Sequence, residues 1–340
     1  MLFITLCVNT LHLFPIYCRL NRTPIIELKI EHSIVTQIDF DLAESSNIIY
    51  LGQFDTVSVH NGTAESTIYE SFDLEGFFQT SCTEIIVLDP VEQCLKKFDR
   101  TTGMQSAFSG TCIYGQSVWR HPTSIIIDRM NSSQYLVTDI ATVKAVDVAT
   151  GNVTMFAQTF LPDIFFEAMA QTENGDIYII DTWTIFKADY YSRDVTLIAG
   201  KLETEGKRDG SLTESRFNEL RSIALISPHA FLVADRWNQC IRLVDVIADK
   251  VSTFDICSKV QKSWFCYVNS VYMTSDALYA GGHHIYIIPC KLVLLLSGPI
   301  WGGHLIGFLL SNFMSFPTIC PISSGSNEKQ NCRTAEQQNR

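Results

Sequence analysis

The chain has 340 residues, of which 46% are hydrophobic and 18% are charged, and its formal net charge at pH 7 is −11. This composition can bury a sizeable core and excludes an intrinsically disordered chain. The acidic balance, with no basic stripe along the sequence, excludes a typical nucleic-acid-binding surface.

The chain begins with a mostly apolar run, and its first charged side chain is Arg19. This run predicts a secretory signal peptide over residues 1–18, with cleavage near Cys18. The first residues lack the usual positive charge, and a few polar residues interrupt the apolar stretch. A mis-assigned start and a buried first strand are therefore the alternatives.

Acceptor sequences for N-glycosylation also favour export. The pattern Asn-x-Ser/Thr occurs at Asn21, Asn61, Asn131 and Asn152, with Asn21 weakened by the proline that follows its Thr. Asn61 and Asn152 fall in predicted hairpin turns, where an acceptor is exposed. We expect the protein to be secreted or to lie on the extracellular face of a membrane.

A short element recurs along most of the chain. It consists of a few β-forming residues, an Asp or its substitute, a brief turn and a second alternating strand, and it occurs at 47–59, 84–99, 134–147, 176–189, 230–245 and 277–289. Each element is the middle pair, b and c, of a unit that strand a precedes and strand d follows. Period-two alternation indicates antiparallel strands. Six units of about 40–50 residues predict an all-β fold, a six-bladed β-propeller over residues 24–298.

The run of residues 195–254 resembles an NHL repeat very closely. The matching features are IAG at 198–200, Asp209-Gly210, Phe217, VAD at 233–235, Asn238, Ile241-Arg242 and VSTF at 251–254. Pro122 matches the proline of the family at the start of strand a, whereas Leu220 replaces it in the best repeat. The resemblance covers roughly residues 36–298 and implies a six-bladed propeller, in agreement with the number of units.

Cysteines occupy the same positions in two units. Cys94 and Cys240 open strand c, and Cys112 and Cys257 follow strand d. Because c and d are antiparallel neighbours, the start of c lies beside the end of d. We expect disulfides Cys94–Cys112 and Cys240–Cys257. The alternative is that the cysteines share these positions by coincidence. Disulfides would imply an oxidising compartment.

The last apolar stretch, residues 292–314, is long enough to span a membrane. However, VLLLSG at 293–298 also matches the strand VTLIAG at 195–200, which leaves 299–318 as an apolar tail. Two interpretations of this stretch remain as alternatives: a membrane span, and a tail that is processed or mispredicted. Residues 319–340 are predicted to be disordered. The segment 23–30 is expected to add a strand to the last blade.

A β-propeller surrounds a central channel, and metal ligands at the mouth of this channel would indicate that the protein is an enzyme. An aspartate stands at the end of strand b in four units: Asp89, Asp139, Asp181 and Asp235. These carboxylates could together coordinate a cation. Alternatively, each could accept backbone N–H groups in its own b–c turn. His283 and His284 lie in a b–c turn, where a channel ligand could sit. This alternative is a lyase or hydrolase that depends on calcium or zinc. The favoured interpretation requires no cofactor.

Loops at the same mouth are the candidates for binding a partner. The insert 200–222 carries charges of both signs, and an equivalent loop contains an aromatic residue beside Arg. The candidate binding residues are Trp119, Arg120, His121, Arg208, Asp209, Arg236 and Trp237. A solvated loop is the alternative. We interpret the chain as a non-enzymatic extracellular module that binds a protein or a glycan and no nucleic acid.

Overall fold

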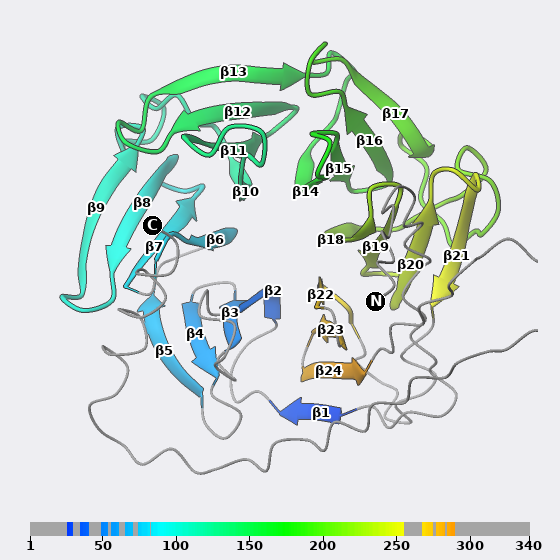
Figure 1. Ribbon diagram of the computed structural model, residues 1–340, viewed down its shortest axis with the longest axis horizontal. Helices are drawn as coiled ribbons and strands as arrows, with labels where there is room; N and C mark the ends of the chain where they lie inside the picture. The colour runs from blue at the N-terminus through cyan, green and yellow to red at the C-terminus, as the bar shows by residue number, and fades with distance from the viewer. Residues whose placement is uncertain are drawn as a thin grey trace, which may run out of the picture. The chain divides into compact units, whose positions relative to one another are not determined.

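The computed structural model describes residues 26–29, 35–40, 49–53, 56–60, 65–70, 74–81, 83–254, 267–274, 277–282 and 284–289. They belong to the first of two compact units, Met1–Leu292. Their strands form four-stranded antiparallel sheets, and we number these sheets I to VI (Figure 1).

The strands of the first three sheets follow one another along the chain. Sheet I contains β2 (Val35–Phe40), β3 (Ile49–Gln53), β4 (Thr56–His60) and β5 (Glu65–Glu70). Sheet II contains β6 (Gly76–Gln79), β7 (Glu84–Asp89), β8 (Cys94–Asp99) and β9 (Met104–Ser109). Sheet III contains β10 (Pro122–Ile127), β11 (Gln134–Asp139), β12 (Thr142–Asp147) and β13 (Val153–Gln158).

The later sheets continue the same order. Sheet IV contains β14 (Phe166–Gln171), β15 (Ile177–Asp181), β16 (Thr184–Ala188) and β17 (Val195–Gly200). Sheet V contains β18 (Leu220–Ser227), β19 (Ala230–Asp235), β20 (Cys240–Asp245) and β21 (Lys250–Phe254). Sheet VI contains β22 (Ser270–Met273), β23 (Ala277–Gly281), β24 (His284–Pro289) and, beside β24, β1 (Ile26–Lys29).

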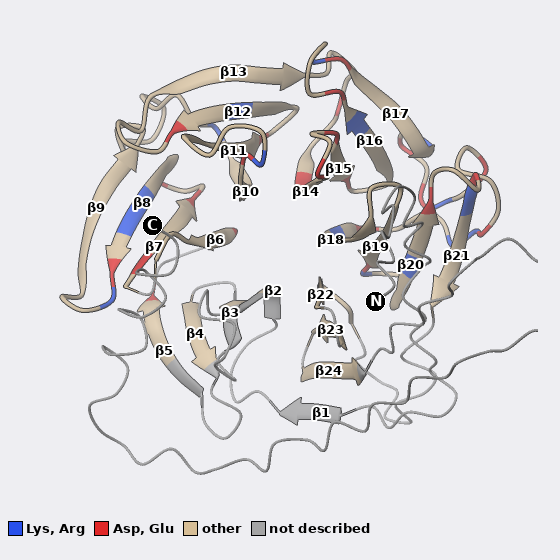
Figure 2. Ribbon diagram, viewed as in Figure 1, with Lys and Arg blue, Asp and Glu red and all other residues tan. Residues whose placement is uncertain are grey.

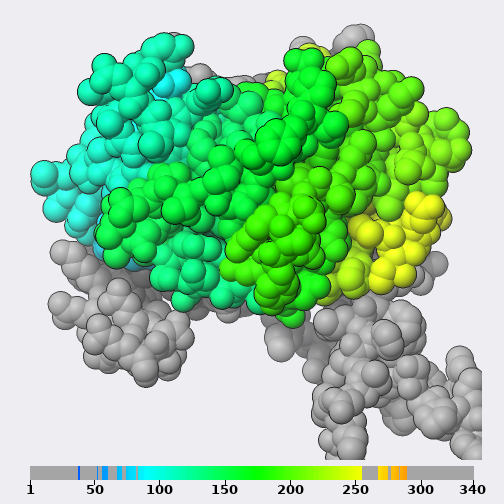
Figure 3. Space-filling model, turned by 90° about the horizontal axis from the view of Figure 1, so that it is seen from above, coloured from blue at the N-terminus to red at the C-terminus, as the bar shows by residue number. Residues whose placement is uncertain are grey.

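The first strand of each sheet is its innermost strand. The strands β2, β6, β10, β14, β18 and β22 contact one another in this order, and β22 contacts β2. The space-filling view shows the segments coloured cyan to yellow packed side by side in chain order (Figure 3). This arrangement confirms the predicted all-β propeller fold.

The last sheet combines the two ends of the described chain. In β1, Ile26 pairs with Ile287 and Lys29 with His284, so β1 runs antiparallel to β24. The expectation that 23–30 adds a strand to the last blade is therefore confirmed. Residues 293–298, the other candidate for this position, lie outside the described residues.

Apolar side chains between neighbouring sheets form the core. Among the described residues, each cluster of buried side chains joins two adjacent sheets; one, for example, packs Leu136 and Val143 of sheet III against Phe166 and Phe186 of sheet IV. The alternation along each strand supplies both faces, because successive side chains point to opposite sides. Burying one such side chain contributes about 1.5–3 kcal/mol, so the stability of each sheet depends on its neighbours.

Aspartates at the end of the second strand fix the loops at one end of the sheets. Asp139 accepts the backbone N–H of His121 at 2.6 Å, and Asp181 accepts that of Phe165 at 3.1 Å. Asp235 likewise accepts the N–H of Asn218 at 2.8 Å. All three donors stand just before the innermost strand of the same sheet. Each carboxylate therefore holds the loop that leads into that strand.

Cationic side chains accompany three of the four aspartates. Lys96 lies 2.9 Å from Asp89, and Lys144 binds Asp139. In sheet V the guanidinium of Arg242 lies 2.8 Å from Asp235, and both side chains are fully buried. In sheet IV, Asp181 instead accepts the hydroxyl of Thr184 at 3.0 Å.

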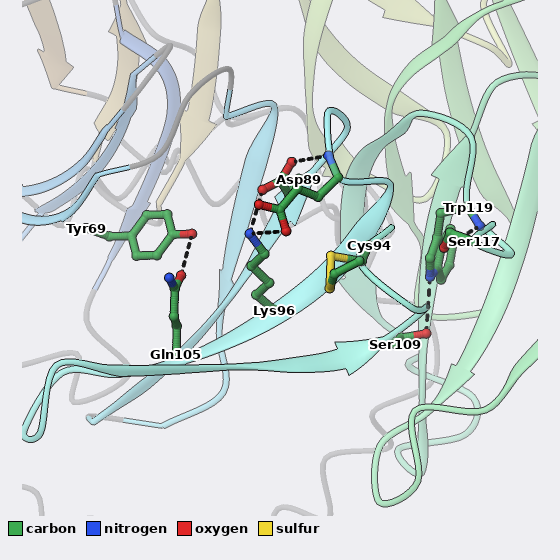
Figure 4. Close-up of a disulfide and its surroundings, with 10 residues drawn as sticks. Tyr69, Asp89, Cys94, Lys96, Gln105, Ser109, Ser117 and Trp119 are labelled. Atoms are coloured by element: carbon green, nitrogen blue, oxygen red, sulfur yellow. Dashed lines mark hydrogen bonds and ion pairs between the residues drawn. A yellow bond between two sulfur atoms is a disulfide. The ribbon is translucent and has the colours of Figure 1, made fainter. Parts of the chain in front are cut away.

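One of the two predicted disulfides is present (Figure 4). Cys94 opens β8 and Cys112 follows β9, with 4.9 Å between their Cα atoms, so Cys94–Cys112 is confirmed. Cys240 is buried at the start of β20. Its expected partner, Cys257, lies outside the described residues, and that pairing stays a prediction.

The predicted terminal segments also lie outside the described residues: 1–18, 292–314 and 319–340. Within the part of the chain that is described, no helix is long and apolar enough to cross a membrane.

Replacing Cys94 and Cys112 with Ser is expected to lower the free energy of unfolding by about 3 kcal/mol, because the disulfide restricts the unfolded chain. Urea denaturation followed by tryptophan fluorescence measures this change. Cys112→Ser alone should give the same loss, since either change removes the bond. An unchanged urea midpoint in the double variant would contradict the prediction.

Replacing Asp235 with Ala is expected to lower the free energy of unfolding by about 3–5 kcal/mol, because it leaves the buried Arg242 guanidinium without its buried counter-charge. The same denaturation experiment measures it. The exposed Asp194 is the control, and Asp194→Ala should change stability little. Equal effects of the two substitutions would show that the buried pair has no special role.

Candidate functional site

The mouth face is the end of the sheets where each second strand ends and each innermost strand begins. Most innermost strands carry a β-bulge at this end, since the register shifts between Val35 and Gln37, Pro122 and Ser124, Phe166 and Ala168, and Leu220 and Ser222. A bulge adds a residue and re-aims its side chain. In sheets IV and V the added residues are Glu167 and Arg221.

Charged side chains gather around the bulges of sheets IV and V, and the charge of Glu75, which precedes β6 of sheet II, acts on them. We call this group the mouth cluster: Glu75, Glu167, Glu219, Arg221 and Arg236. The Nη1 atom of Arg221 lies 2.9 Å from Glu167 Oε2, and its Nη2 atom lies 2.7 Å from Glu219 Oε1. Arg236 Nη1 contacts the same Glu219 oxygen at 2.6 Å. Figure 2 shows the acidic colour on β14 and the basic colour on β18.

Burial governs the charge state of the cluster. Burial raises the pKa of Glu167 to about 7; Arg221 opposes this shift, and the charges of Glu75, Asp181 and Glu219 add to it. Burial alone would lower the pKa of Arg221, but its carboxylate partners raise it. Burial also raises the pKa of Asp181. The mouth of sheets IV and V therefore holds a carboxyl group that changes charge near neutral pH.

Some buried polar atoms near this cluster have no partner within the described residues. They are Glu219 Oε2, Arg236 Nε and both amide atoms of Asn269. Glu219 immediately precedes β18, and Asn269 immediately precedes β22, the adjacent innermost strand. Unpaired buried groups are unusual in folded proteins, because each loses its hydrogen bonds to water.

The loop 119–121 differs from the expected contact loop. Trp119 is fully buried, and its indole Nε1 donates to Ser109 Oγ at 3.2 Å (Figure 4). The ring of His121 packs edge-on against Phe165, and the Arg120 side chain is exposed. The indole of Trp119 thus supports the loop from inside, and Arg120 is the residue that a partner could reach.

The insert 200–222 is fixed to sheet V by Arg242. The buried guanidinium donates to the carbonyl oxygens of Arg208 and Arg216 at 2.7 and 2.8 Å. It also lies 2.7 Å from the Asp209 carboxylate, which accepts the hydroxyl of Thr253. Asp209 therefore anchors the insert, whereas the side chain of Arg208 remains mostly exposed beside Glu214.

Arg236 and Trp237 occupy the b–c turn of sheet V. Arg236 belongs to the mouth cluster, and its guanidinium carbon lies 5.5 Å from the centre of the Trp237 ring. Trp237 is 53% exposed and meets Tyr267 edge-to-face at 5.7 Å. Of the candidate binding residues, Arg236 is the one that belongs to the mouth cluster, and Trp237 lies against it.

The candidate metal ligands are spread over different sheets. Asp89, Asp139, Asp181 and Asp235 each bond within their own sheet. Within the described ranges, the donors that lie close enough for one ion are those of Glu92, Cys94 and Cys112, and these two sulfurs are bonded to each other. His284 opens β24, and His283 lies outside the described residues. A calcium or zinc site stays a prediction.

Two glycosylation candidates, Asn131 and Asn152, are exposed in turns, and Asn61 lies outside the described residues.

Sequence reasoning missed Glu75, Glu167, Glu219 and Arg221. A signal was present, since Glu167 and Arg221 interrupt otherwise apolar first strands at the same position.

Comparison with family models found no match for this chain, and neither did comparison with curated proteins. Solved structures do match. An auxiliary nutrient binding protein from Bacteroides thetaiotaomicron has a TM-score of 0.63 and 13% identity, covering 78% of this chain and 76% of that one. Catalytically inactive virginiamycin B lyase from Staphylococcus aureus, solved with quinupristin, has a TM-score of 0.54 and 10% identity, covering 78% and 99%.

A third match is the extracellular domain of a protein assigned to a one-component system of Bacteroides thetaiotaomicron. Its TM-score is 0.53 and its identity 11%, covering 79% of this chain and 40% of that one. At such low identities these matches establish the propeller fold alone. They do not establish membership of the NHL family.

Replacing Glu167 with Gln is expected to change how stability depends on pH. The pKa of Glu167 is about 7 in the fold, whereas the ordinary pKa of a glutamate side chain is 4.5, so between these values the folded chain binds more protons than the unfolded chain. The free energy of unfolding therefore falls as pH rises through this window, by about 3 kcal/mol.

Urea denaturation at pH 5 and pH 8 tests this difference. Glu167→Gln should gain stability relative to the wild type at pH 8 and not at pH 5. Glu173→Gln is the control, since Glu173 is exposed at the other end of sheet IV. A stability difference that is the same at both pH values would contradict the assigned pKa.

Proposed function

We propose that this chain is an extracellular binding module, a six-bladed propeller of the NHL type whose mouth face receives the ligand. The mouth cluster supports this proposal most directly, because it brings together charged side chains of sheets IV and V that are only partly satisfied by one another. Ordinary solvated charges would not be buried to this extent: the Glu167 side chain is only 11% exposed.

Further features support the same proposal. The six sheets and the contact between β22 and β2 favour a closed ring of six blades. The disulfide Cys94–Cys112 favours an oxidising compartment, and hence secretion or the extracellular face of a membrane. Neighbours of the same fold include a nutrient binding protein and an extracellular domain.

The alternative is a lyase or hydrolase that depends on a metal at the mouth. One neighbour of the same fold is a lyase. Metal analysis of the purified chain in chelator-free buffer separates the two. A stoichiometric zinc or calcium ion that is lost on replacing Asp139 and Asp181 with Asn would favour the enzyme.

The binding proposal is tested by placing substitutions at the two ends of the sheets. The full chain is immobilised, and a panel of secreted proteins and glycans is passed over it in a surface plasmon resonance experiment. Replacing the exposed Phe160 and Trp237 of the mouth face with Ala should weaken binding at least tenfold, because such anchors dominate binding energy.

The matched control replaces Tyr191 and Ile247 with Ala. Both are exposed side chains, and they lie in c–d turns at the opposite end of the sheets. This variant should bind as the wild type does. Loss of binding in the control alone would place the ligand on the other face and overturn the proposal.

A further inference from the structure

Apolar side chains are exposed on the mouth face of sheets II, III and IV. The side chain of Phe160 is 87% exposed and that of Tyr114 is 76% exposed. Phe160 belongs to the loop from β13 to β14, and Tyr114 belongs to the loop from β9 to β10. Other exposed apolar side chains lie in these two loops and in the turn from β7 to β8. We call the whole set the apolar crest: Val91, Ile113, Tyr114, Val118, Phe160 and Leu161.

The two loops of the crest are attached to the same part of sheet III. Lys144 of β12 donates a hydrogen bond to the carbonyl oxygen of Val118 at 2.6 Å. Just before β12, the carbonyl oxygen of Ala141 accepts the N–H of Thr159 at 3.1 Å. A ring from each loop also meets the other edge-on, with 4.8 Å between the ring centres. The crest is therefore one surface shared by neighbouring loops, unlike the single exposed apolar residues that are common on soluble proteins.

The loop from β9 to β10 is held in one conformation although its apolar side chains are exposed. The disulfide Cys94–Cys112 joins the start of this loop to β8 (Figure 4). Gln93, in the turn from β7 to β8, accepts the N–H of Gly115 at 2.7 Å and donates to the carbonyl oxygen of Arg120 at 3.1 Å. These bonds also tie the loop to the turn that carries Val91. A surface fixed in this way loses little conformational entropy when a partner binds.

The crest carries little charge, although the net charge of the chain is −11. Residues 110–119 and 157–162 contain no charged side chain, and the exposed Arg120 follows the first of these runs. Two exposed acids, Glu92 and Asp163, border the crest in the sequence. Aromatic and aliphatic side chains accompanied by Arg, with acids at the margin, are the composition of a protein–protein interface.

Two other occupants fit the crest less well. A lipid bilayer adapts to the shape of an inserted loop, so it has no need of a loop that a disulfide and side-chain hydrogen bonds hold in place. The carboxylates of Glu92 and Asp163 would also face the phosphates of the lipid headgroups. A second copy of the chain would bring two molecules of the same large negative charge together, which opposes association.

We propose that the apolar crest is the docking surface for a protein partner that offers an apolar groove with an acidic side chain opposite Arg120. The rings of Tyr114 and Phe160 enter this groove as anchors. The proposal rests on the proposed function as a binding module, and it names the part of the mouth face that is used and the class of ligand.

The test uses the full chain and a phage-displayed library of random disulfide-cyclised peptides, because such a peptide can form a small groove around an exposed side chain. Peptides selected on the wild-type chain should combine apolar residues with at least one Asp or Glu. Synthetic copies of these peptides should compete with one another for one site. Replacing their acidic residue with its amide should weaken binding, because Arg120 then loses its counter-charge.

Substitutions then locate the site. Tyr114→Ala and Phe160→Ala should each weaken binding of the selected peptides at least tenfold, because aromatic anchors carry most of the binding energy. Tyr191→Ala is the matched control, since Tyr191 is 75% exposed in a turn at the opposite end of the sheets, and it should bind normally. Gln93→Ala should weaken binding severalfold while every crest side chain is kept, because it frees the loop.

Two further measurements address the other occupants. Flotation with vesicles of phosphatidylcholine and phosphatidylserine should leave the wild-type chain unbound, and sedimentation should show a monomer. Vesicle binding that Tyr114→Ala abolishes would assign the crest to a membrane. A dimer that the same variant dissociates would assign it to a second copy. Either result would overturn the proposal.

The peptide experiment can overturn the proposal by itself. It does so if no peptide is selected, if Tyr191→Ala loses as much binding as Tyr114→Ala, or if Gln93→Ala binds as the wild type does. A secreted protein whose binding in the surface plasmon resonance experiment is lost in Trp237→Ala and kept in Tyr114→Ala would reject the crest and leave the binding module standing. Absence of binding in both experiments would reject both proposals.

Discussion

The mouth face depends on one interaction, the hydrogen bond from the backbone of an incoming loop to an aspartate at the end of the second strand. Asp139, Asp181 and Asp235 accept such N–H groups in sheets III, IV and V. A buried carboxylate is costly unless donors surround it. The loop that brings the donors is therefore held in one place, and so is the first residue of the innermost strand behind it. Apart from Glu75, which precedes β6 of sheet II, every charged side chain of the mouth cluster is positioned from such a strand or from the adjoining turn.

Sheet IV shows what happens where the accompanying cation is missing. Lys96, Lys144 and Arg242 stand beside the aspartates of sheets II, III and V, whereas the donors to Asp181 among the described residues are neutral. Its charge raises the pKa of the nearby Glu167, and the compensating cation is Arg221, which comes from the next sheet. The electrostatic balance of the mouth is thus shared across the boundary between two sheets. This boundary is held by apolar packing, so the core and the site depend on each other.

Alternation and turn residues were sufficient to predict the strands, and the repeated cysteine positions were sufficient to predict Cys94–Cys112, because both are local patterns. The mouth cluster could not be predicted in the same way. Glu167 and Arg221 turn toward it through bulges, and a bulge depends on the pairing of two strands rather than on one segment. Trp119 shows the same limit: its position in a loop indicated exposure, but its indole packs inward onto Ser109. Sequence places a residue along the chain, whereas the direction of its side chain is decided by neighbours far away in sequence.

The pairing of β1 with β24 has a consequence for biosynthesis. Ile26 finds its partner, Ile287, only after almost all of the described chain has left the ribosome. Until then β1 is without its partner strand, and sheet VI cannot be completed. Pairing between such distant segments slows folding and prolongs the exposure of strand edges. The last step of assembly is therefore the one at which a newly made molecule is most vulnerable to pairing with another copy of itself.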